Sequence, residues 1–158
     1  MSGANSNSTP LKTILVAGIV AGTMDIVAAL TQFYIKTEKD PTIVLRYIAS
    51  AVFGKEASTG GTSMALVGLF FHYVIAFGFV ILFFLLCSKI AWLWKNKIIS
   101  GLLYGIIVWI IMSQVVLPLS LIGRAPLDLE KAIVPILILM FCIGLPTSLI
   151  VSRYYERK

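Results

Sequence analysis

The sequence predicts an all-α polytopic membrane protein with four transmembrane helices and an interfacial helix between the first and the second. The composition is the first reason: 59% of the residues are hydrophobic and 13% are charged, whereas a soluble domain is nearer half and a quarter. Four long apolar runs are the second, since about 20 apolar residues cross a bilayer as a helix. The third is an amphipathic run after the first of them, at 42–53, which is too short to span.

The chain has 158 residues, which leaves room for one membrane domain and no second one. We expect residues 1–11 to form a disordered N-terminal tail, because they are rich in Ser and Asn and poor in apolar side chains. Residues 12–158 are then a single four-helix transmembrane domain.

The first span is predicted at Ile14–Ile35 and carries a carboxylate, Asp25, near its middle. A charge at this depth is costly and usually faces the protein interior or water, so Asp25 is a candidate functional residue. The alternative is a buried Asp that only fixes helix packing. At helical spacing, one stripe holds small and polar residues: Gly18, Gly22, Asp25, Ala29 and Gln32. The opposite face is predicted to contact lipid through Ile19, Val20, Ile26, Val27, Leu30 and Phe33.

The same run has some features of a secretory signal peptide, with Lys12 before it and small residues at 27–29. Apolar sequence continues beyond those residues, which favours a retained span.

The segment Thr42–Phe53 is predicted to be an interfacial or re-entrant helix that begins at an Asp40 cap. Arg46 would extend to water along its apolar stem. With Lys55 and Glu56, which follow, it forms a candidate outer mouth. The predicted apolar side comprises Ile43, Val44, Tyr47, Ile48, Ala51 and Val52.

The second span, predicted at Met64–Leu86, carries His72 on a stripe of small residues that includes Gly68. Asp25 lies ten residues before the end of the first span, and His72 lies about as far after the start of the second. Antiparallel neighbours would hold both side chains near one depth, about 15 Å into the membrane. A carboxylate and an imidazole that meet there can share a proton. The alternative is a hydrogen-bonded core histidine, the commoner role of a lone histidine.

The third span is predicted at Ile98–Leu121, with a close-packing pair at Gly101 and Gly105 and a bend or end at Pro118. The fourth is predicted at Ala132–Ser152 and contains two prolines, which mark kinks. Supporting polar side chains for the candidate proton site are Gln32, Tyr104, Ser113 and Gln114. The helix-packing glycines are Gly18, Gly22, Gly68, Gly101 and Gly105.

Motifs for nucleotide binding, hydrolysis or metal ligation are absent from the sequence. We therefore expect no enzyme activity, no catalytic residue, no cofactor and no metal. The net charge of +6 is interpreted as membrane topology and headgroup contact rather than nucleic-acid binding. The expected partners are the lipid bilayer and either a second copy of the chain or another membrane protein.

Three functions fit these residues. The first is a proton-linked or pH-responsive transport or stress role that uses an intramembrane Asp25–His72 pair. The second is a structural or accessory membrane subunit that binds partner helices through glycine-rich faces. An intramembrane enzyme is the weakest of the three, because no nucleophile stands beside an evident base.

The segment 71–77 (Phe-His-Tyr-Val-Ile-Ala-Phe), with Lys89-Ile90, Gly101, Gly105 and Pro118-Leu119, resembles the uncharacterised small bacterial inner-membrane proteins typified by YagU. The resemblance covers the middle and third quarter of the chain, and His72 corresponds to a histidine of that pattern. It implies a bacterial inner (cytoplasmic) membrane location and a link to acid tolerance. The segment between the first two spans is much shorter here than in that family.

The basic residues indicate an orientation. With four spans, both termini and the link at 88–97 share one side, and that link contains three lysines and no acid. Short basic segments favour the cytoplasmic side. We expect a multi-pass protein with both termini in the cytoplasm.

Overall fold

The computed structural model describes residues 9–123 and 128–157, and these form helices without a strand. The helices are α1 (Pro10–Thr37), α2 (Thr42–Phe53), α3 (Gly61–Lys89), α4 (Ala91–Lys95), α5 (Lys97–Ile111), α6 (Leu117–Leu119), α7 (Leu129–Ile138) and α8 (Leu145–Glu156). A 3₁₀ turn, Gly54–Thr59, follows α2, and π-helical segments at Met112–Val116 and Leu139–Gly144 connect α5 to α6 and α7 to α8.

Four of the continuous helical segments are long and apolar enough to cross a membrane: Pro10–Thr37, Gly61–Lys89, Lys97–Leu119 and Glu130–Glu156. The prediction of an all-α polytopic protein is therefore confirmed. Each predicted span lies within or nearly within its helix, and three of the four helices extend the span at both ends.

The predicted disordered tail lies mostly outside the described residues, which begin at Thr9. Its last two residues, Pro10 and Leu11, belong to α1 instead. The helix starts this early because the Thr9 hydroxyl accepts a hydrogen bond from the Lys12 backbone N–H (3.3 Å) and Pro10 occupies the first turn, a favourable position for proline.

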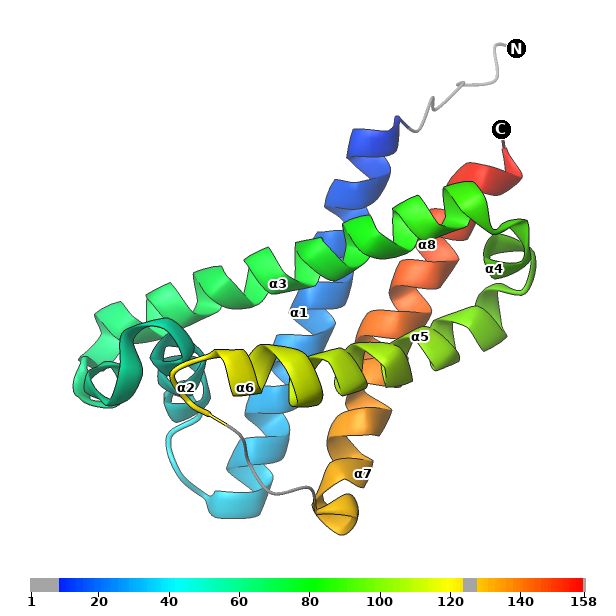
Figure 1. Ribbon diagram of the computed structural model, residues 1–158. Helices are drawn as coiled ribbons and strands as arrows, with labels where there is room; N and C mark the ends of the chain where they lie inside the picture. The colour runs from blue at the N-terminus through cyan, green and yellow to red at the C-terminus, as the bar shows by residue number, and fades with distance from the viewer. Residues whose placement is uncertain (1–8, 124–127, 158) are drawn as a thin grey trace.

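The long helices come together at one end of the molecule and spread apart at the other (Figure 1). α1 runs antiparallel to α7 and α8, and α3 runs antiparallel to α5. The start of α1 and the end of α8 lie at the converging end, where α4 packs against α8. At the spread end, α2 packs against α3 and also contacts α1.

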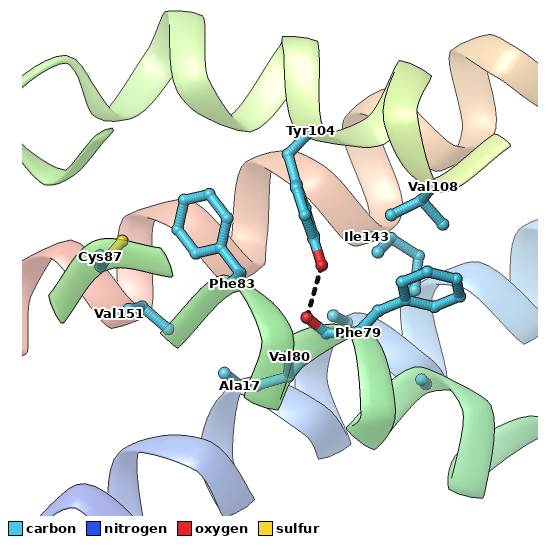
Figure 2. Close-up of a cluster of buried hydrophobic side chains, with 11 residues drawn as sticks. Ala17, Phe79, Val80, Phe83, Cys87, Tyr104, Val108, Ile143 and Val151 are labelled. Carbon is cyan, nitrogen blue, oxygen red and sulfur yellow. Dashed lines mark hydrogen bonds between the residues drawn. The ribbon is translucent and has the colours of Figure 1, made fainter. Parts of the chain in front are cut away.

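The core lies where α1, α3, α5 and α8 meet (Figure 2). Phe83 and Val80 of α3 are fully buried there beside Val108 of α5 and Val151 of α8. The apolar side chains that face outward are largely exposed. This distribution suits a membrane, in which lipid tails solvate the outer surface.

Glycine allows α5 to approach the fourth span closely. A Cβ added at Gly105 would overlap the backbone of Met140, and one added at Gly101 would lie 2.9 Å from the Leu145 Cα. A Cβ at Gly144 would overlap the carbonyl oxygen of Gly101. The two backbones therefore touch, as small residues permit between membrane helices.

The remaining predicted packing glycines contact α3 or lie on it. Gly18 of α1 meets the Phe77 ring, and Gly22 meets the Tyr73 ring. Gly68 of α3 faces the backbone of α2 at Leu45 rather than α1. The prediction that Ile26 contacts lipid was wrong, since its exposed fraction is 5%. Ile26 continues the buried stripe of α1 that holds Ala17, Ala21 and Gly22, four residues after the last of them.

Each π-helical segment ends two residues before a proline. Pro118 has no N–H for the carbonyl of Gln114, and Pro146 has none for that of Cys142; each of these carbonyls falls inside a π segment. A proline ring also clashes with the carbonyl four residues earlier. A wider turn relieves the clash, which is one origin of π-bulges and helix bends.

The prediction that Asp40 caps a helix starting at Pro41 is only partly confirmed, because α2 begins at Thr42 and its N-cap is Pro41, which makes no side-chain cap hydrogen bond. The Asp40 carboxylate accepts hydrogen bonds from the Thr42 N–H (3.0 Å) and the Thr42 hydroxyl, and it lies 3.9 Å from Arg46. Of the predicted apolar side of α2, Tyr47 and Val52 are exposed, and the buried residues are Ala49 and Ser50. The buried face of α2 is narrower than the predicted apolar side, and it lies where the backbone of α2 packs on Gly68.

The hydrogen bonds from Thr42, assisted by Arg46, hold the pKa of Asp40 below its ordinary value. The hydrogen bonds of the Asp40 carboxylate are therefore fully present above its ordinary pKa of about 3.9 and are lost only as pH falls further, through the lowered pKa. We expect the Thr42 amide to exchange hydrogen faster at pH 3 than at pH 6, after correction for the intrinsic rate. Hydrogen exchange measured by mass spectrometry checks this.

Asp40→Ala should show fast corrected exchange at both pH values, because no acceptor remains. Asp40→Asn keeps an acceptor without a titrating charge and should show no change between the two. A pH effect that persists in the Asn variant would contradict the assignment.

Candidate functional site

Asp25 of α1 and His72 of α3 face each other inside the bundle. The Asp25 Oδ2 lies 4.0 Å from the His72 Nδ1, and the side chains are 16% and 11% exposed. Each residue lies about 17 Å along its helix from the end nearer α2, by the rise of an α-helix. The structure thus brings the acid and the imidazole together at a common depth, at a separation longer than a direct hydrogen bond.

The second ring nitrogen of His72 is fixed by the backbone of α1. His72 Nε2 lies 2.9 Å from the carbonyl oxygen of Gly22. A carbonyl only accepts, so Nε2 carries the hydrogen and donates it. The nitrogen that gains or loses a proton is therefore Nδ1, which faces Asp25. Gly22 also lets α3 come close enough for this bond, since a Cβ there would crowd Tyr73.

A cavity of about 80 Å³ borders the pair. This is room for a few water molecules and not for a larger solute. Asp25 and His72 are the ionisable residues of its lining, and the rest is apolar. Residues from α2, α3, α5 and both π segments complete the wall: Ile48, Ile75, Ala76, Phe79, Val108, Met112, Leu139 and Ile143.

Tyr104 is the supporting polar residue nearest to this cavity. Its hydroxyl donates a 2.6 Å hydrogen bond to the carbonyl oxygen of Phe79, and Phe79 lines the cavity (Figure 2). The Tyr104 ring packs on Phe83, with 4.7 Å between centroids. Tyr104 therefore ties α5 to α3 behind the cavity wall and does not line the cavity itself.

The other supporting polar residues lie elsewhere. Gln32 lines a groove of about 860 Å³ between α1 and α7, separate from the Asp25–His72 cavity. Ser113 donates to the Ile110 carbonyl (3.3 Å), and Gln114 donates to the Ser113 hydroxyl (3.3 Å). Neither of these two lines the cavity.

The predicted outer mouth does not adjoin the pair. Arg46 lies within 4 Å of Asp40, and Lys55 and Glu56 are exposed on the 3₁₀ turn. None of them lines the cavity. The residue of this region that does is Ile48, which the sequence placed only among apolar positions.

Sequence reasoning missed the π segments as parts of the site. Met112 and Leu139 belong to them and line the cavity. The prolines at 118 and 146 were the available signal. In the described part of the chain, no group of three or more His, Cys, Asp or Glu side chains could hold a metal ion.

No protein-family model, no curated protein and no solved structure matches the chain.

Proposed function

We propose that the protein is a membrane protein that binds and releases a proton at the Asp25–His72 pair, in a proton-linked or pH-responsive transport or stress role. The observation that carries this proposal is the 4.0 Å approach of the two side chains beside a small cavity. Paired ionisable groups within a membrane commonly form proton relays.

The geometry supports an attraction between the Asp25 and His72 side chains that depends on their protonation. When His72 is protonated and Asp25 is ionised, the two attract each other across 4.0 Å in a low dielectric. Protonation of Asp25 or loss of the Nδ1 proton removes that attraction. Because the pair joins α1 to α3, proton binding changes how strongly these two helices hold together.

The size of the cavity limits the cargo. A space of about 80 Å³ admits water and protons, so the proposal concerns protons rather than an organic solute. A larger substrate would require a second copy of the chain.

Proteoliposomes with an imposed pH gradient test this proposal. We expect proton uptake by the unchanged protein and at least a tenfold loss in both Asp25→Asn and His72→Gln, because neither amide titrates. Asp40→Asn, which removes an exposed acid, is the matched control and should retain the flux. Identical flux in all four proteins would end the proposal.

The accessory-subunit alternative depends on glycine faces that are free to bind other helices. All five glycines contact helices of this same chain, so they lend that alternative no support. A partner protein that co-purifies in stoichiometric amount, and that the Gly22→Leu variant fails to retain, would support the accessory-subunit alternative.

We further propose a bacterial inner-membrane location with both termini in the cytoplasm. The support is the lysine-rich, acid-free segment at 88–97, which lies at the same end of the molecule as the start of α1 and the end of α8 (Figure 1). The resemblance of the segment at 71–77 to the YagU-like proteins favours the same compartment.

A further inference from the structure

Three cationic side chains surround a hollow at the converging end of the helices. Lys12 comes from the first turn of α1, and Arg153 and Arg157 come from the last turn of α8 and its end. The hollow has a volume of about 180 Å³, and its lining contains no acidic residue. The other lining residues are Thr13, Val16, Ile150 and Tyr154.

No carboxylate side chain offsets this positive charge. All seven Asp and Glu residues of the chain lie in the described part, and Lys12, Arg153 and Arg157 form no ion pair with any of them. Glu156, the acid next to Arg157 in sequence, lies 2.8 Å from Lys97 instead. Like charges around one hollow repel each other, so an anion from outside the chain would stabilise it.

The depths at which the cationic and the apolar lining residues lie indicate which kind of anion the hollow binds. Val16 lies one helical turn deeper in the membrane than Lys12, and Ile150 lies nearly one turn deeper than Arg153. The cationic side chains lie at the helix ends, and the apolar side chains lie deeper. A phospholipid has the same arrangement, with its phosphate at the membrane surface and its acyl chain below. A free phosphate ion would gain nothing from Val16 and Ile150.

We propose that this hollow is a binding site for an anionic phospholipid. The phosphate lies among Lys12, Arg153 and Arg157, and the acyl chain follows the outer faces of Val16 and Ile150. Guanidinium groups suit this role because they bind phosphate oxygens in pairs. Basic pockets between transmembrane helices recognise anionic headgroups in the same way. The site does not depend on the function proposed for Asp25 and His72.

Short-chain lipids added to the purified protein in an uncharged detergent test the proposal. Binding is measured by native mass spectrometry for three probes: dioctanoyl phosphatidylglycerol, dioctanoyl phosphatidylcholine and inorganic phosphate. We expect saturable binding of phosphatidylglycerol and little binding of the other two. Equal binding of phosphatidylcholine, or of phosphate alone, would overturn the assignment to an anionic lipid.

A pair of matched variants locates the site. Arg153→Gln with Arg157→Gln should weaken phosphatidylglycerol binding about 25-fold, at roughly fivefold for each charge removed. Lys89→Gln with Lys95→Gln removes the same charge at the same end of the molecule, outside the hollow, and should weaken it less than twofold. If both double variants weaken phosphatidylglycerol binding equally, the lipid is attracted to the basic surface in general, and the assignment of the site is overturned. If the arginine pair fails to fold, Lys12→Gln, with an expected fivefold effect, replaces it.

Discussion

Gly144→Ala is expected to destabilise the protein by about 3 kcal/mol or more, at the upper end of the range for overpacking. The new methyl group would overlap the Gly101 carbonyl oxygen and lie 2.7 Å from the Gly105 backbone N. Both atoms belong to the backbone of α5, so no side-chain rotation can relieve the clash. The whole α5 helix must move away from the fourth span, and their close contact is lost.

Gly78→Ala is the matched control. Gly78 also lies within a spanning helix, but a Cβ there meets nothing within 4 Å, and alanine favours a helix more than glycine does. We expect this variant to be at least as stable as the unchanged protein. Unfolding in mixed micelles at increasing dodecyl sulfate, followed by circular dichroism, compares the two. Equal stability of the two variants would mean that α5 and the fourth span are not in backbone contact.

A double-mutant cycle on Asp25→Asn and His72→Gln is expected to give a coupling free energy of about 1–3 kcal/mol near neutral pH. Each single variant leaves the other partner mostly buried without its counter-charge, which is costlier than losing both. The coupling should vary with pH, because either protonation of Asp25 or loss of the Nδ1 proton removes the attraction. Unfolding free energies of the four proteins at several pH values provide the measurement.

The cycle has an internal control at Arg46 and Asp40, a pair 3.9 Å apart in which the Asp40 side chain is 57% exposed. Surface ion pairs contribute about 0–1 kcal/mol, so Asp40→Asn with Arg46→Gln should show weaker coupling. A coupling for Asp25 and His72 that is no larger and does not vary with pH would indicate that the two side chains pack together without exchanging charge.

The architecture was predictable because each deciding signal is local. Length and apolar content determine which segments span a membrane, and small residues at a spacing of four mark close packing. The facing of Asp25 and His72 was also predictable, since both lie on the small-residue sides of consecutive antiparallel helices at similar depth.

The cavity wall was not predictable, because it depends on contacts between distant segments. Gln32 lies on the same helical stripe of α1 as Asp25. At the position of Gln32, however, α1 has diverged from α3, and Gln32 lines the groove between α1 and α7 instead. A π segment shifts the helical phase of the residues that follow its start, and Ile143 of the second π segment lines the cavity beside Met112 and Leu139, where the two segments begin. Helical periodicity read along a uniform α-helix cannot include such a shift.

The splayed arrangement of the long helices has a consequence for the surrounding bilayer. The protein is narrow at the end where α1 starts and α8 ends, and it is broad at the opposite end (Figure 1). It therefore occupies less area in one leaflet of the bilayer than in the other. Lipids beside the narrow side have room to spread, while those beside the broad side are compressed. Many copies crowded together, all inserted the same way, would therefore favour a curved membrane over a flat one.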